Sequence, residues 1–414
     1  MAVVNPFKAL RPVKEMAGVV SSQPFDSASK DLADAEMEHN PYSYLHVVKP
    51  HLHFKGEKKN PQKHFPLGLE YLSKFKEKGV LIKDEEPCYY IYRIIHGSKA
   101  YTSLIACASV DDYLNNNILK HENTLTEKQN ELAEHIRFFN SLGNPVLLTY
   151  PDDAKIDEVI NNYINNHIPE YNFISTDQKK HNLWVVSDNN DIETIRQRFT
   201  DISKLYIADG HHRSSGSATY TKFKRRETGN FNGKEPFNFF PVCLIPFSKL
   251  TIYEYHRLVK YPINDLHALL KKVEQSFDII PSGNLPVQPL AKCEFGLYVK
   301  HKAFLLKPKQ HILNVLNSTL EKLDVSIVEK YLLNDVFEIT DSKTDNRLSF
   351  LDGGKGIGHL QELVDNGDFD IAITLYPTSV EEMVNVANEH LIMPPKSTWI
   401  EPKIRTGLII YEHI

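Results

Sequence analysis

The stretch that decides the fold is KLYIADGHHR, residues 204–213. Residues 204–208 form a short apolar run, which predicts a buried strand. The polar residues Asp209 to Arg213 interrupt this run, and residues 214–226 then have helical character. A strand, a turn and a helix in this order place free N–H groups and the positive end of a helix dipole beside the turn. The stretch therefore predicts an α/β unit with an anion site where the strand meets the helix.

The rest of the chain continues this alternation of strands and helices. We expect strands or hairpins at residues 89–95, 101–107, 146–150, 183–186, 294–300, 301–306, 349–352, 370–376 and 406–411. We expect helices at residues 66–78, 126–142, 155–167, 265–277, 316–333, 357–366 and 380–390. The first 60 residues and the polar segment 55–64 are expected to be loops. The pattern predicts a mixed α/β fold with one domain at residues 1–262 and a C-terminal α/β subdomain at residues 263–414.

Composition excludes several classes of protein. The 414 residues include 48 Lys+Arg and 53 Asp+Glu, a net charge of −5, which argues against a protein that coats nucleic acid. No run of about 18 apolar residues predicts a membrane span. The first eight residues lack the apolar core of a secretion signal, so we expect a cytoplasmic protein. The four cysteines form no C-x-x-C pair, so no zinc knuckle is expected.

The turn DGHHR, residues 209–213, carries the strongest chemical signal. Gly210 allows the backbone to approach a ligand closely, and Arg213 offers a two-pronged donor to a phosphate. Asp209 is a candidate magnesium ligand, and His211 and His212 are candidates for phosphate contact and catalysis. The alternative is a surface turn with two incidental histidines.

Two further segments contain candidate site residues. In KHENT, residues 120–124, Glu122 is a candidate general base, and Lys120 and His121 are candidate phosphate contacts. The alternative is that Glu122 only stabilises the dipole of the following helix. In MPPKST, residues 393–398, two prolines stiffen a loop that presents Lys396 as a candidate phosphate contact, unless the loop is simply a crossover. The glycine-rich run at residues 353–358 lacks the spacing of a nucleotide loop and predicts a tight turn.

These segments resemble the landmarks of a microbial family known as domain of unknown function 1015. The resemblance spans nearly the whole chain in the family's order and rests on PFKALRP (6–12), KHENT (120–124), YIADGHHR (206–213), YHRLV (255–259) and MPPKST (393–398). The family commonly has a P-P-Y-D segment near its N-terminus, where this chain has Gln23-Pro24-Phe25-Asp26. It usually has an acidic residue where this chain has Gln129.

The DGHHR turn also resembles the phosphate loop of the ParB/sulfiredoxin superfamily, which includes free-serine kinases. This resemblance implies a ParB/sulfiredoxin-like nucleotide core, ADP or ATP as the phosphate donor, and magnesium. Sulfiredoxins have a cysteine in this loop, whereas this chain has His211, so reduction of a sulfinic acid is not expected.

Two functions follow as hypotheses. The first is a nucleotide-dependent phosphotransferase that acts on a small hydroxylated metabolite, with free L-serine as the first candidate. The second is a ParB-like regulatory protein that binds a nucleotide without turnover. The partners expected are a nucleotide and a small-molecule substrate, with neither a membrane nor nucleic acid, and a homo-oligomer is left open.

Overall fold

The computed structural model describes residues 2–24, 30–57 and 59–414. They form a mixed α/β structure, as predicted, that divides into two compact units. Unit 1 contains the residues up to Leu250 together with Pro402–Ile414, and unit 2 contains Thr251–Glu401. The sequence-based boundary at residue 262 falls inside unit 2. No helix in the described part of the chain is long and apolar enough to span a membrane.

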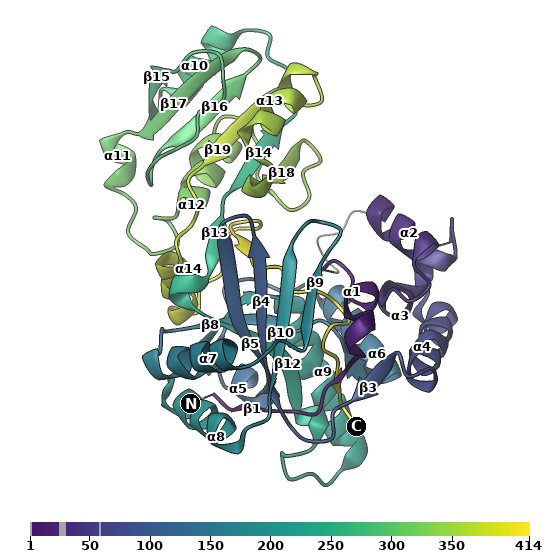
Figure 1. Ribbon diagram of the computed structural model, residues 1–414. Coiled ribbons are helices and arrows are strands. Elements are labelled where there is room, and N and C mark those ends of the chain that lie inside the picture. The colour runs from purple at the N-terminus through teal and green to yellow at the C-terminus, as the bar shows by residue number, and fades with distance from the viewer. Residues whose placement is uncertain (1, 25–29, 58) are drawn as a thin grey trace. The chain divides into compact units, whose positions relative to one another are not determined.

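Unit 1 is built on a nine-stranded mixed sheet (Figure 1). The strand order is β6, β11, β8, β12, β5, β4, β10, β9, and β1 pairs with β5. The predicted hairpin is present as β4 and β5, and the predicted strand at residues 146–150 is β8. The strands have these bounds: β1 Val4–Asn5, β4 Tyr89–His96, β5 Lys99–Ser109, β6 Ile118–Leu119, β8 Val146–Tyr150, β9 Tyr171–Ile174, β10 Lys180–Val186, β11 Leu205–Asp209 and β12 Phe239–Pro246.

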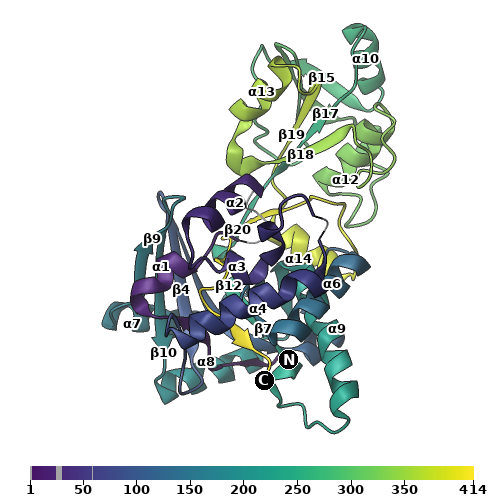
Figure 2. The same ribbon diagram turned by 90° about the vertical axis from the view of Figure 1, so that its right-hand side faces the viewer.

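Helices cover this sheet and bury its apolar side chains. α7 (Ala154–Asn166) and α8 (Asn189–Asp201) lie against one side in Figure 1 and contribute Ile160 and Phe199 to the core. Figure 2 shows α4 (Pro61–Glu77), α6 (Thr126–Phe139) and α9 (His211–Thr228) together in front of the sheet. The other α-helices of unit 1 are α1 Ala17–Val20, α2 Lys30–His39, α3 Leu45–Val48 and α5 Val110–Leu114. Short 3₁₀ helices lie at Lys14–Met16, Pro50–His53, Pro236–Asn238 and Phe247–Lys249.

The prediction of loops over the first 60 residues and at residues 55–64 is wrong. Helices α2 and α3 lie in the first region, and α4 starts five residues earlier than expected, at Pro61. The side chain of Asn60 accepts a hydrogen bond from the amide of Lys63, and Pro61 fits the first helical position because its missing N–H is not needed there. The first turn of α4 is polar, so no apolar periodicity in the sequence indicates where this helix begins.

Two small pairings complete unit 1. β2 (Leu10–Pro12) pairs with β3 (Leu81–Lys83), and β21 (Tyr411–Glu412) pairs with β7 (Ser141–Leu142). The strand predicted at residues 406–411 is therefore much shorter than expected. The last residues of the chain nevertheless close the structure of its first 250.

Unit 2 contains a six-stranded antiparallel sheet in the order β15, β17, β16, β19, β14, β18. Its strands are β14 Tyr255–Val259, β15 Phe277–Pro281, β16 Phe295–Val299, β17 Lys302–Pro308, β18 Leu348–Asp352 and β19 Ile371–Leu375, with β13 Thr251–Tyr253 paired to β20 Trp399–Glu401. The helices are α10 Leu266–Val273, α11 Gln310–Leu313, α12 Asp324–Val328, a π-helix at Glu329–Asn334, a turn at Gly353–Lys355, α13 Ile357–Asp365 and α14 Val380–Asn388.

The helix predicted at residues 316–333 starts late. The side chain of Glu321 accepts hydrogen bonds from the amides of Asn317 and Ser318, and this local turn competes with helical bonding. α12 therefore begins at Asp324 and continues directly into the π-helix.

Candidate functional site

Two of the predicted segments leave the sheet side by side. β6 and β11 are parallel, with Ile118 opposite Leu205 and Leu119 opposite Tyr206. Because parallel strands end at the same edge of a sheet, KHENT after β6 and DGHHR after β11 start next to each other. Their candidate residues therefore form one site in unit 1.

The turn itself is tighter than the sequence suggested. α9 begins at His211 rather than at residue 214, so three of the turn residues form the first helical turn. Gly210 precedes the helix with φ +105°, and a Cβ there would lie 2.9 Å from Cζ of Arg213. Both facts require glycine, because an L side chain would be strained and would collide with the guanidinium.

Asp209 and Arg213 are joined by an ion pair. Nη2 of Arg213 donates to Oδ2 of Asp209 over 2.7 Å, while Nζ of Lys403 donates to Oδ1 over 3.2 Å. Burial raises the pKa of Asp209, but the charges of Lys403 and Arg213 outweigh it and hold that pKa far below its usual range. Both oxygens of Asp209 thus face cations that belong to the protein.

The guanidinium of Arg213 is buried, with 8% of the residue exposed. Its Nη1 donates to Oδ1 of Asn144 over 2.8 Å and to the carbonyl of Pro145. A phosphate bound by this arginine would have to replace protein partners, so in this structure Arg213 fastens the turn to the segment before β8.

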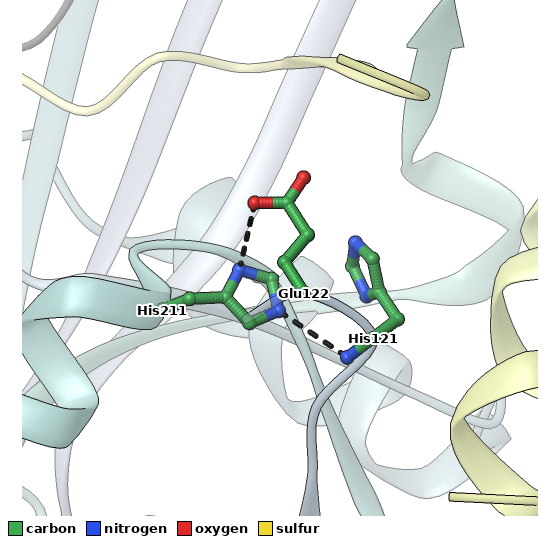
Figure 3. A group of neighbouring side chains, drawn as sticks. All are labelled: His121, Glu122 and His211. Carbon is green, nitrogen blue, oxygen red and sulfur yellow. Dashed lines mark hydrogen bonds and ion pairs between the residues drawn. The ribbon is translucent and has the colours of Figure 1, made fainter. Parts of the chain in front are cut away.

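The second cluster contains Glu122, His121 and His211 (Figure 3). Nδ1 of His211 lies 3.6 Å from Oε2 of Glu122, and the amide of His121 donates to Nε2 of His211 over 3.4 Å. The two imidazole rings meet edge to face with centroids 4.5 Å apart. Since Nε2 of His211 accepts a hydrogen bond, the proton of the neutral ring is on Nδ1 and faces Glu122.

Burial sets the charge of the two rings. It lowers the pKa of His121 to about 3 and that of His211 to about 3, so both are neutral at pH 7. The side chain of Glu122 is 37% exposed and connects this buried pair to solvent. A half-exposed carboxylate beside a neutral N–H donor can accept a proton from a bound hydroxyl.

The other candidates have different surroundings. His212 accepts a hydrogen bond on Nε2 from the amide of Leu125 over 3.2 Å, which ties α9 to the start of α6. Lys120 is exposed, and its charge contributes to the low pKa of His211. Lys396 belongs to unit 2, where its Nζ lies 5.4 Å from the ring centroid of Tyr255. Asp26 lies outside the described residues.

Sequence reasoning missed Lys403 and Asn144. Lys403 is 194 positions from its partner Asp209, and it follows the whole of unit 2. Asn144 lies in a loop between two short strands. Neither position carries a motif, and only the fold brings them to the turn.

Comparison with known proteins establishes the family. The family described as protein of unknown function (DUF1015) matches residues 4–326, and the chain belongs to it. No curated protein matches the chain.

Solved structures give distant likenesses. A free serine kinase mutant in complex with ADP is 13% identical, covering 76% of this chain and 95% of that one, with a TM-score of 0.37. A conserved hypothetical protein from Pyrococcus furiosus is 14% identical, covering 76% and 98%, with a TM-score of 0.33. SbnI with a C-terminal truncation, from Staphylococcus aureus, is 11% identical, covering 73% and 85%, with a TM-score of 0.36.

Proposed function

We propose that unit 1 binds ADP or ATP and transfers a phosphate to the hydroxyl of a small metabolite, on a ParB/sulfiredoxin-like core. One observation carries the proposal: the Glu122 carboxylate lies beside His211, the first residue of the 18-residue helix α9. The start of a helix stabilises phosphate charge, and a carboxylate within reach can accept the hydroxyl proton. Free L-serine is the first substrate to test, because the sequence resembles that of free-serine kinases.

The residues divide into three roles. Glu122 accepts the proton of the substrate hydroxyl, and the N–H of His211 orients its carboxylate. Gly210 and the first amides of α9 face the donor phosphates, with Lys120 as the exposed cation nearby. Such catalysis depends on positioning and on charge neutralisation rather than on a covalent intermediate.

Asp209 and Arg213 take a different part in this proposal than the sequence suggested. They hold the turn in place through their ion pair, and His212 holds the start of α6. Magnesium prefers free oxygen ligands, whereas both oxygens of Asp209 are paired with Lys403 and Arg213. The residues around Asp209 therefore do not fit a magnesium ion, and no step is assigned to one.

The deciding experiment compares Glu122→Gln with Glu127→Gln, the same change on the exposed first turn of α6. Both variants are incubated with L-serine and ATP or ADP, and phosphoserine is measured by mass spectrometry. We expect Glu122→Gln to lower kcat by roughly 10²- to 10⁴-fold while nucleotide affinity stays within a few-fold. Full turnover by Glu122→Gln would exclude this assignment.

The occupied guanidinium of Arg213 favours a second candidate, a regulatory protein that binds a nucleotide without transfer. That arginine is not free to neutralise a transferring phosphate. Calorimetry with ADP, ATP and CTP distinguishes the two functions, because binding without any phosphorylated product supports the regulatory one.

A further inference from the structure

The buried imidazole of His121 indicates a second property of the same cluster. His121 is 1% exposed, and no side chain of the described residues forms a hydrogen bond with its two ring nitrogens; only the backbone of Ile207 lies within reach of the ring. A buried polar side chain with so few partners is costly, and a bound ion is one of the arrangements that satisfies such a group. Figure 3 shows this ring beside the imidazole of His211 and the carboxylate of Glu122.

The three side chains have the composition of a metal site. One ligand atom from each of His121, Glu122 and His211 lies within 4.8 Å of the others. We propose that these three residues bind a divalent transition ion of the zinc type. Two imidazoles and one carboxylate select such an ion over magnesium, whose preferred ligands are oxygens, and three protein ligands leave a position open for water or substrate.

The geometry needs only a small adjustment. In a tetrahedral zinc site, bonds of about 2.0–2.1 Å separate neighbouring ligand atoms by about 3.3 Å. The 3.6 Å between Nδ1 of His211 and Oε2 of Glu122 is close to that value. The ligand atoms of the cluster lie within 4.8 Å of one another, so the ring of His121 has to move inward by up to about 1.5 Å, and its place on a loop rather than within a helix or strand permits this.

Binding of the ion also changes the tautomer of His211. The ion takes the place of the proton on Nδ1, the proton moves to Nε2, and the ring stays neutral. The hydrogen bond from the amide of His121 to Nε2 is then given up, and at 3.4 Å it is a long one.

The ion and the proposed phosphate transfer use Glu122 in different ways. A carboxylate bound to an ion no longer accepts the proton of a substrate hydroxyl. A zinc-type ion is thus expected to inhibit the proposed transfer, although its binding does not depend on that function.

The test uses the full chain stripped with a chelator and free of nucleotide. Co²⁺ is titrated by visible absorption and Zn²⁺ by calorimetry into the parent, Glu122→Gln and Glu127→Gln, and ¹⁵N spectra report the histidine rings. We expect the parent to bind one ion that Glu122→Gln binds at least tenfold more weakly and that Glu127→Gln binds as the parent does. Two histidines should show ligation shifts in the parent.

The rings of His46 and His53 also lie together, with centroids 5.0 Å apart. Any ion that they hold is common to the three proteins and cancels in the comparison. The proposal is overturned if the parent binds no ion at least tenfold more tightly than Glu122→Gln does, or if Mg²⁺ binds equally well while the imidazole signals stay unchanged. Since no nucleotide is present, a failure of phosphate transfer leaves this result intact, and a failure to bind the ion leaves the phosphotransferase proposal open to its own test.

Discussion

Two of the buried arginines, one from each unit, have different partners. Arg213 of unit 1 forms an ion pair with Asp209. Arg257 of unit 2 is 1% exposed and has no ion pair within the described residues; it donates to the carbonyls of Tyr255 and Lys396, and its Cζ lies 5.0 Å from the ring centroid of Phe350. Burial lowers the pKa of Arg257 to about 10. The turn in unit 1 is thus held by paired charges, whereas the strand in unit 2 is held by carbonyls and packing.

The largest expected difference between the two units is the change in their stability when the pH is lowered. The pKa values of His121 and His211 are each lowered by burial to about 3, so between pH 6.5 and 3 the unfolded chain binds more protons than the folded one. Unit 1 therefore loses stability as the pH falls through this range. These two rings alone contribute on the order of 2–4 kcal/mol between pH 7 and pH 5, and the pKa values of His135, His181 and His413, which burial also lowers, add to the loss.

In unit 2, two buried groups have opposite effects on how stability changes with pH. Burial lowers the pKa of His256 to about 4, which acts in the same direction, but it raises the pKa of Asp324 to about 7, which makes unit 2 more stable as the pH falls from 7 towards 4. We expect a nearly constant stability of unit 2 between pH 7 and pH 5. Urea unfolding followed by Trp184 in a Trp399→Phe variant, and by Trp399 in a Trp184→Phe variant, reports each unit separately. Equal losses in both units would contradict the prediction.

Asp209→Asn tests the paired charges of unit 1. The change leaves Arg213 buried and Lys403 without a carboxylate, and it should lower the free energy of unfolding of unit 1 by about 2–3 kcal/mol, since Asp209 is partly exposed. The fluorescence of Trp184 in urea measures this loss. Asp201→Asn, at a side chain that is 62% exposed, is the matched control and should stay within about 0.5 kcal/mol of the parent.

Arg257→Met tests the packed arginine of unit 2. Two carbonyls lose their donor, but a buried charge is removed as well, so we expect a smaller loss of about 1–2 kcal/mol. Trp399 is a suitable reporter, because its ring centroid lies 5.7 Å from that of Tyr255. A loss larger than that of Asp209→Asn would reverse the contrast between the units.

Asp324→Asn tests whether Asp324 keeps the stability of unit 2 constant between pH 7 and pH 5. Of the substitutions considered, it has the smallest expected effect on the free energy of unfolding at pH 7. Its carboxylate accepts from the amide of Cys293, and an asparagine oxygen can replace that acceptor, so the change should cost less than about 1 kcal/mol. The variant should nevertheless make unit 2 lose stability on acidification, because His256 then acts alone. Unit 2 stability that stays constant with pH in this variant would show that Asp324 is not the opposing group.

The sequence predicts local structure better than the contacts that complete the site. Continuous apolar runs identify strands such as β8, and Asp153, whose side chain caps α7, agrees with the helix predicted there. The two-residue strand β6 is too short to give a pattern, yet its parallel pairing with β11 brings Glu122 to the turn. Arg213 also donates to Asn144, and Asp209 accepts from Lys403; the fold brings both of these partners to the turn from distant positions.

The insertion of unit 2 between Leu250 and Pro402 sets an order for synthesis. A ribosome makes the 151 residues of unit 2 before Lys403 and β21 emerge, which takes roughly 8–30 s at about 5–20 residues per second. Throughout that interval, the nascent unit 1 lacks the lysine that pairs with Asp209 and the strand that pairs with β7. The inserted unit can fold first, while the unit that begins earlier is finished last.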